Sequence, residues 1–269
     1  LAKAKSLLRP AVPKGLLNRV RRSRKGQRQL DARQTFLAEV RPSDIFLVGH
    51  PKSGNTWLAY MLAILVNDDR ERKINIANVG EFIPRIHARD QAIRKHAGLR
   101  PPRIFRNEGP VFPELYPRTI YIVRDPRAAL LSYYHHCVHD TGDSDWRIDD
   151  FVDEMLREGC IKKLEPFLVR WDRQVNFWTQ RAEQQDVHFV RYEDLKADRQ
   201  LAMEAVNRFI GLDGAEDNLA EAVNRGEFTS MRGEEKAYGA EAYADEKGAK
   251  GFFVRKGKVD SWKEEMPAE

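Results

Sequence analysis

The chain has 269 residues, of which 42% are hydrophobic and 32% are charged. A chain of this length and composition buries one substantial core, so we expect one globular domain with a tail. The apolar stretch 57–66 is too short to span a bilayer, which excludes a transmembrane helix there and favours a soluble protein.

Basic charge is concentrated at the N-terminus. Residues 1–28 hold ten Lys or Arg and no acid, and the rest of the chain has 36 basic against 41 acidic residues. The charge therefore gives little reason to expect nucleic acid as a partner. We divide the chain into a basic arm, residues 1–43, and a domain, residues 44–269. Leucines lie between the charges of the arm, which predicts either an amphipathic helix in weak contact with an anionic membrane surface or a solvated, partly helical segment that packs on the domain.

The two cysteines of the chain, Cys137 and Cys160, lie in unrelated segments. They indicate neither a disulfide framework nor a CxxC metal motif. A protein without disulfides suits a reducing compartment, so we expect it in the cytoplasm.

Short apolar runs alternate with helical segments along the domain. The expected strands are residues 45–48, 119–123 and 187–192. The helices expected after them are residues 56–66, residues 127–134 and a helix that reaches 209. This alternation predicts an α/β fold of three layers, α/β/α, with a central parallel sheet. Residues 151–182 and 219–225 are also predicted to be helical, whereas residues 231–251, rich in Gly, Glu and Ala, are predicted to form a mobile loop.

Residues 49–56, GHPKSGNT, lie between the first strand and its helix. Backbone N–H groups and the helix dipole converge on an anion at such a place, so the segment is predicted to be a P-loop-like phosphate-binding loop. Asn55 stands where a nucleotide triphosphatase has its lysine, and the lysine of this loop is Lys52. This difference disfavours ATP hydrolysis. A glycine-rich turn formed by chance is the alternative.

Four motifs resemble those of the PAPS-dependent sulfotransferase family of the cytosolic type. They are PKSGNTW at residues 51–57, Arg124-Asp125-Pro126-Arg127 with Ser132, Tyr192-Glu193-Asp194, and Arg255-Lys256-Gly257 with Trp262. Together they cover roughly residues 44–263. The resemblance implies an enzyme that transfers a sulfuryl group from 3'-phosphoadenosine 5'-phosphosulfate (PAPS) to an acceptor and needs no metal ion.

The resemblance also implies what the loop residues do. Lys52 would neutralise the charge that builds on the bridging oxygen as the S–O bond breaks, which makes it the first candidate catalytic residue. Trp57 would offer a flat face to adenine, with plain core packing as the alternative. The residues that would surround the 5'-phosphate are Ser53, Gly54, Asn55 and Thr56.

The resemblance further implies a clamp for the 3'-phosphate. Its members would be Arg124, Ser132, Arg255, Lys256 and the N–H of Gly257. Arginine forms planar, paired hydrogen bonds to phosphate oxygens, and such a clamp would distinguish PAPS from ATP. Tyr192 and Phe228 would contact the base. The likeness is looser for Phe228, because Gly226 stands where the family has a threonine.

The general base of the family does not recur in this chain. Where the family has a histidine two residues before a proline, the chain has Glu108 two residues before Pro110. We therefore predict that the Glu108 carboxylate accepts the proton of the acceptor, which a carboxylate within hydrogen-bond reach of a hydroxyl can do. The alternative is that Glu108 is an ordinary loop acid, with the base elsewhere or the activity lost.

Other interpretations stay open at this point. His135 and His139 share one helical face and suggest a metal site, although the resemblance implies none. A phosphotransferase that uses ATP and a catalytically silent protein that binds nucleotide or nucleic acid are the alternative functions. The acceptor would be a small molecule, sugar or lipid with a hydroxyl or amine, and no motif identifies it. The aromatic residues expected in the core or in an acceptor pocket are Phe167, Trp171, Phe177 and Trp178.

Overall fold

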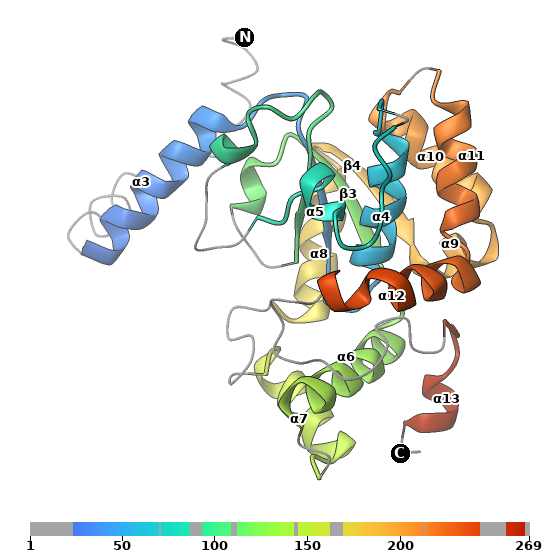
Figure 1. Ribbon diagram of the computed structural model, residues 1–269. Helices are drawn as coiled ribbons and strands as arrows, with labels where there is room; N and C mark the ends of the chain where they lie inside the picture. Colours follow the sequence, from blue (N-terminus) through green and yellow to red (C-terminus); the bar gives the residue numbers. More distant parts are fainter. Residues whose placement is uncertain are drawn as a thin grey trace.

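The computed structural model describes residues 24–69, 71–86, 93–108, 112–142, 145–161, 169–212, 214–242 and 257–266, with the backbone alone for 24–30, 140 and 240–242. The strands are β1 (Ile45–Gly49), β2 (Ile104–Asn107), β3 (Arg118–Val123) and β4 (Asp186–Arg191). The α-helices are α3 (Arg24–Glu39), α4 (Asn55–Leu65), α5 (Val79–Phe82), α6 (Pro126–Thr141), α7 (Ile148–Glu158), α8 (Trp171–Ala182), α9 (Tyr192–Ala197), α10 (Arg199–Ile210), α11 (Glu216–Arg225), α12 (Phe228–Ala242) and α13 (Trp262–Glu265) (Figure 1). Two short 3-10 helices are η1 (Ile93–His96) and η2 (Pro113–Leu115).

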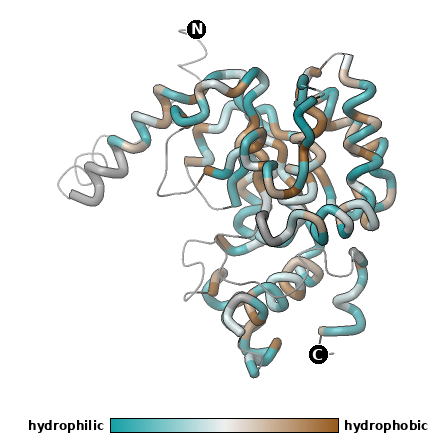
Figure 2. Tube along the Cα trace, in the orientation of Figure 1, coloured by the Kyte–Doolittle hydropathy of each residue, from teal (hydrophilic) through white to brown (hydrophobic). Residues whose placement is uncertain are grey.

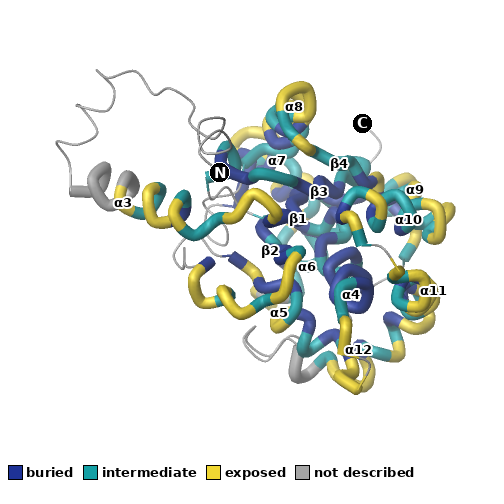
Figure 3. The backbone as a smooth tube through the Cα atoms, turned by 90° about the horizontal axis from the view of Figure 1, so that it is seen from above, coloured by how far each residue is buried: buried dark blue, intermediate teal, exposed yellow. Residues whose placement is uncertain are grey.

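The four strands form one parallel sheet in the order β2-β1-β3-β4. Side chains of β1 alternate between its two faces. Ile45 and Leu47 pack in one hydrophobic cluster with α4, α10 and α11, whereas Phe46 and Val48 pack in another with α3 and α8. Figure 3 shows α4 and α8 on opposite sides of the strands. The predicted three-layer fold with a central parallel sheet is confirmed.

Helix α4 is buried along most of its surface. Nine of its eleven residues are buried, and it packs against β1 on one side and α11 on the other. Figure 2 shows hydrophobic residues gathered along this helix and the strands, with hydrophilic residues on the outer helices. The helix predicted at 56–66 is therefore confirmed, and it carries the end of the phosphate-binding loop on a rigid element.

The opposite face of the sheet is covered by aromatic rings. Phe46 stacks on Tyr116 with ring centroids 3.9 Å apart, and Trp178 of α8 lies 6.1 Å from Tyr116 and 5.8 Å from Tyr121. Trp178 is 1% exposed, so it belongs to the core, one of the two places expected for it. Phe36 of α3 is fully buried beside Phe46, which anchors the end of α3 on this face.

A buried ion pair lies at the start of β1 and β2. The guanidinium of Arg103 donates from Nε to Oδ1 of Asp44 (2.8 Å) and from a terminal nitrogen to Oδ2 (2.6 Å), and both side chains are at most 2% exposed. Arg103 also donates to the carbonyl of Glu39, and the N–H of Arg41 donates to Asp44. These bonds connect the end of α3 to the edge of the sheet.

Asp44→Asn is expected to destabilise the protein by about 3–5 kcal/mol, because it leaves the buried guanidinium of Arg103 without its counter-charge. Urea unfolding followed by circular dichroism measures this loss. The matched control is Asp186→Asn, which breaks the more exposed pair of Asp186 with Arg118 (2.7 Å). That change is expected to cost about 1 kcal/mol or less, and equal losses for both variants would contradict the prediction.

The structure corrects the predicted boundaries in several places. Residues 104–107, for which no strand is predicted, form β2. The helix predicted after β4 is interrupted at Asp198, whose side chain accepts a hydrogen bond from the N–H of Leu201 and thereby caps α10. The helical prediction over 151–182 holds for α7 and α8, but α7 ends at Gly159 in a left-handed conformation (φ 77°).

The prediction of a mobile loop at 231–251 is wrong for residues 231–242, which belong to α12. Glu, Ala and Lys favour a helix strongly enough to offset the cost of its two internal glycines, about 1 kcal/mol each. Met231 and Glu235 are buried, so tertiary packing adds to this preference. Residues 243–251 lie outside the described part of the chain.

None of the helices described has the length and apolar character needed to cross a membrane. Most of the basic arm, residues 1–23, lies outside the described residues. Contact of the arm with a membrane surface, its division from the domain at residue 44 and the cytoplasmic location all stay predictions.

Candidate active site

The predicted phosphate-binding loop joins β1 to α4. Lys52 has a φ of 63° and Gly54 a φ of 105°, so the loop passes through two left-handed positions; the first is uncommon and costly for a residue with a side chain. Asn55 donates from Nδ2 to the carbonyl oxygens of His50 (3.0 Å) and Gly49 (3.3 Å). Asn55 therefore fastens the loop from the inside rather than extending toward a ligand.

The loop has donors suited to an anion. The N-cap residue of helix α4 is Gly54, which makes no side-chain cap, so the first N–H groups of the helix are not satisfied by a side chain there. The hydroxyl of Ser53 is buried, and no hydrogen-bond partner for it exists among the described residues. Burying a hydroxyl without a partner is unfavourable, and a phosphate oxygen seated in the loop would supply one. The residues present thus fit a phosphate group.

A cavity opens beside the loop, with about 790 Å³ of space between the protein atoms, part of it open to solvent. Residues singled out from the sequence that line it are Lys52, Gly54, Trp57, Arg124, Ser132, Tyr192, Phe228 and Gly257. The fold thus brings seven residues of four separate motifs, together with Phe228, to one cavity.

Cations and aromatic rings follow one another along this cavity. Arg124 donates to the carbonyl oxygen of Lys52 (3.0 Å), and its guanidinium lies 4.2 Å from the ring centroid of Tyr192. The ring of Tyr192 meets that of Trp57 edge to face at 5.5 Å. The cavity therefore has a cationic end at Lys52 and Arg124 and an aromatic end at Trp57 and Phe228, which suits a molecule with phosphates at one end and a flat ring at the other.

Gly257 allows the C-terminal segment to approach the aromatic end. Its φ of 61° is left-handed, and a Cβ at this position would collide with the ring of Phe228. Both facts require glycine here. The two neighbouring residues of the predicted clamp, Arg255 and Lys256, lie outside the described residues.

Three predicted binding residues do not line the cavity. Ser53 and Asn55 are buried inside the loop, and the hydroxyl of Thr56 accepts a hydrogen bond from Arg106 (3.3 Å). Thr56 thus connects the start of α4 to β2, and β2 leads directly to Glu108.

Glu108 follows β2 at the carboxyl edge of the sheet, next to the phosphate-binding loop. Its Oε2 lies 2.5 Å from a guanidinium nitrogen of Arg85, and its side chain is 18% exposed. Burial alone would raise the pKa of Glu108, but Arg85, Arg106 and Lys52 together hold it below the ordinary value. Glu108 is therefore a carboxylate at neutral pH and lies within the electrostatic influence of Lys52.

No histidine lines the cavity in the part of the chain that is described. His50, in the loop itself, is 1% exposed, and burial lowers its pKa to about 4. It is neutral at physiological pH. The Nε2 atom of His135, one of the two histidines that suggested a metal site, lies 3.2 Å from Oε2 of Glu265. No group of three side chains that could hold a metal ion occurs among the described residues.

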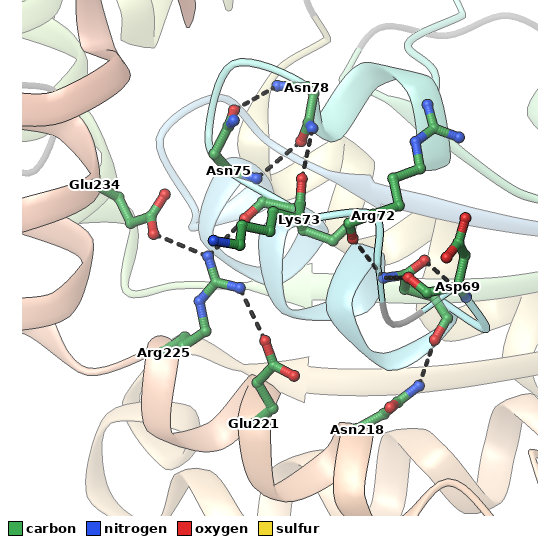
Figure 4. A network of polar contacts seen from close by, with 11 residues as sticks. Asp69, Arg72, Lys73, Asn75, Asn78, Asn218, Glu221, Arg225 and Glu234 are labelled. Atoms are coloured by element: carbon green, nitrogen blue, oxygen red, sulfur yellow. Dashed lines mark hydrogen bonds and ion pairs between the residues drawn. The ribbon is translucent and has the colours of Figure 1, made fainter.

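A polar network holds α12, which carries Phe228, in place (Figure 4). Arg225 at the end of α11 donates to Glu221 (2.9 Å), to Glu234 of α12 (2.9 Å) and to the carbonyl of Ile74 (2.6 Å). One guanidinium thus connects α11, α12 and the segment before α5. Sequence reasoning missed the bond to the carbonyl of Ile74, because Ile74 lies 151 positions from Arg225 in the chain.

Sequence reasoning also missed some of the cavity wall. The additional lining residues are Lys196, Gly226, Met231, Lys258 and Ser261. Helical spacing could have indicated two of them, since Lys196 is four residues after Tyr192 and Met231 is three after Phe228.

A family model described as "Sulfotransferase domain" matches residues 42–269. The chain is 25% identical over 246 residues to an amine sulfotransferase of Oryctolagus cuniculus, which covers 86% of this chain and 78% of that protein. It is similar in fold to a mouse sulfotransferase complexed with PAP, the desulfonated form of PAPS (TM-score 0.63, 20% identity, 85% of this chain and 80% of that one). It is also similar to a retinol dehydratase in complex with androsterone and PAP (TM-score 0.64, 17% identity, 87% and 79%). The chain therefore belongs to the sulfotransferase family, a family of PAPS-dependent enzymes.

Proposed function

We propose that the cavity binds PAPS with its 5'-phosphosulfate at the loop of Lys52, its 3'-phosphate beside Arg124 and Ser132, and its adenine between Trp57 and Phe228. One observation carries this proposal, namely that residues from all four motifs line a single cavity with a cationic end and an aromatic end. Arg255 and Lys256 stay predicted members of the 3'-phosphate clamp.

The proposed reaction breaks the bond between sulfur and the bridging oxygen of PAPS and forms a bond between sulfur and the acceptor oxygen or nitrogen. Lys52 donates a hydrogen bond to the bridging oxygen and stabilises the charge that develops on it as PAP leaves. Glu108 accepts the proton that the acceptor loses. Its lowered pKa keeps Glu108 ionised at neutral pH, the state in which a carboxylate can accept a proton.

The acceptor is proposed to be a small molecule with a hydroxyl or an amine, with a sugar or a lipid as the wider alternatives. Support comes from two similar proteins, the amine sulfotransferase and the retinol dehydratase seen with androsterone. Incubating the protein with radiolabelled PAPS and a panel of steroids, phenols, amines, sugars and lipid alcohols tests this proposal. Label is expected in at least one small-molecule product, and label only in a macromolecular acceptor would contradict it.

Arg124→Met is expected to weaken PAP binding about 10- to 100-fold, because it removes charge-assisted hydrogen bonds to the 3'-phosphate. Binding of 5'-AMP, which lacks that phosphate, is expected to change little. Isothermal titration calorimetry with both nucleotides measures the difference. The control is Arg191→Met, since Arg191 is exposed and pairs with Asp194 at 3.7 Å. Equal losses for PAP and 5'-AMP in the Arg124 variant would contradict a 3'-phosphate contact.

A further inference from the structure

Lys196 occupies the aromatic end of the cavity, although no sequence motif singled it out. It belongs to α9, one helical turn after Tyr192, and its side chain lines the cavity wall. Its ammonium nitrogen lies 5.9 Å from the ring centroid of Trp57 and 5.7 Å from that of Phe228. These distances are within the range of a cation–π contact with each ring, so Lys196 lies beside the two rings proposed to hold the base.

The surroundings leave this ammonium available for a ligand. Lys196 is partly buried, and burial, followed by the nearby charge of Arg199, lowers its pKa. Glu227 acts in the opposite sense on Lys196 but is bonded to Arg199 at 2.7 Å. Among the described residues, no carboxylate lies within salt-bridge distance of Lys196. An ammonium has three N–H donors, so Lys196 can donate hydrogen bonds into the cavity.

Trp57 and Gly226, which also line this part of the cavity, offer no competing side-chain donor. The indole N–H of Trp57 is already bonded to the carbonyl of Gly226 (2.8 Å). A Cβ at Gly226 would lie 2.5 Å from the sulfur of Met61 and 3.0 Å from the carbonyl of Ala222, so a residue with a side chain does not fit there without rearrangement. Besides Lys52 and Arg124, the cavity is lined by two charged side chains, Lys196 and Lys258. Lys196 is the one whose ammonium lies near the rings of both Trp57 and Phe228.

We infer that Lys196 recognises the base of the bound nucleotide by donating a hydrogen bond to a ring nitrogen on its outer edge. The inference rests on the proposed function, which seats the phosphates at Lys52 and Arg124. A series of contacts runs from the backbone of Lys52 through Arg124, Tyr192 and Trp57 to Lys196, which lies near the two rings proposed to hold the base. The edge of adenine that carries the amino group has two accepting nitrogens, N1 and N7, and one of them is the proposed partner.

Calorimetric titration of PAP into Lys196→Met tests this inference. Methionine keeps an unbranched chain but removes the donor, and PAP binding is expected to weaken about 10-fold, the usual effect of losing a hydrogen bond from a charged group. Lys196→Arg retains a cationic donor and is expected to recover part of the loss. The matched control is Lys236→Met, which removes the same charge from an exposed position on α12 outside the cavity. Its PAP affinity is expected to equal that of the wild type.

Analogues of PAP identify the atom that is recognised. Two analogues are compared, one with N1 and one with N7 of the base replaced by carbon. One of them is expected to bind the wild type more weakly than PAP does. The same analogue is expected to bind Lys196→Met as tightly as PAP binds that variant. The inference is overturned if Lys196→Met binds PAP as tightly as the wild type does, or if Lys236→Met loses as much PAP affinity as Lys196→Met. It is also overturned if each analogue lowers the affinity of Lys196→Met as much as it lowers that of the wild type. A wild-type protein that does not bind PAP would instead refute the proposed function.

Discussion

Replacing Lys52 by methionine is expected to lower kcat about 100- to 1,000-fold, the usual effect of removing one donor that stabilises charge in a transition state. The backbone of Lys52 holds the loop and accepts the hydrogen bond of Arg124, and methionine preserves both features. PAP affinity is therefore expected to fall far less than kcat. Single-turnover transfer of radiolabel from PAPS, together with calorimetric titration of PAP, separates the two effects.

Lys236→Met again serves as the control, because it removes a positive charge that does not line the cavity. Its kcat is expected to match that of the wild type. If Lys52→Met kept the wild-type kcat, or if it lost kcat only in proportion to PAP affinity, Lys52 would bind the donor without acting on the leaving oxygen. The proposed chemistry would then be wrong, while the cavity could still bind the nucleotide.

Glu108→Gln is expected to lower kcat/KM about 100- to 10,000-fold, the range found for loss of a general base. The change removes the proton acceptor and keeps the size of the side chain. Glu114→Gln is the matched control, since Glu114 lies six residues further on and pairs with Arg33 at 3.2 Å. Both variants are measured with the same acceptor at saturating PAPS, and a Glu108 variant as active as the control would contradict the assignment.

The dependence of activity on pH gives a second test of the same residue. The base acts only when ionised, that is, at pH values above its pKa. Because Arg85, Arg106 and Lys52 hold the pKa of Glu108 below its ordinary value against the effect of burial, the wild type is expected to keep full kcat/KM down to mildly acidic pH as far as this group is concerned. Arg85→Met removes the closest cation, so the pKa of Glu108 rises and activity is lost at a higher pH. If kcat/KM of Arg85→Met fell at the same acidic pH as that of the wild type, Glu108 would not control the rate.

The sheet and the loop could be predicted because their signals are local. Buried parallel strands are continuous apolar runs, and the sequence of 49–56 follows such a run and precedes an apolar helix. β2 was missed because its four residues include Arg106 and Asn107, which do not resemble a buried strand, although Asn107 is buried and bonded to the hydroxyl of Tyr116. Helix α12 was missed because glycine content was weighed above the helical preference of its neighbours.

The residues of the candidate site could also be predicted only where their signal is local in the sequence. Residues within a motif, such as Trp57 and Arg124, could be assigned from their order in the chain. The approach of Lys196 to the ring of Phe228 could not, because it depends on how α9 and α12 meet in the fold. The exclusion of a side chain at Gly226 likewise depends on Met61 of α4, a contact between segments far apart in sequence.

The central claim is that the cavity holds a nucleotide with a 3'-phosphate at the loop of Lys52, and it is tested most directly by comparing PAP with ATP as ligands of the wild-type protein in thermal unfolding. At about 100 times its Kd, PAP is expected to stabilise the folded state by about 2.7 kcal/mol, and ATP at the same concentration by much less. No stabilisation by PAP, or a larger stabilisation by ATP, would contradict the account.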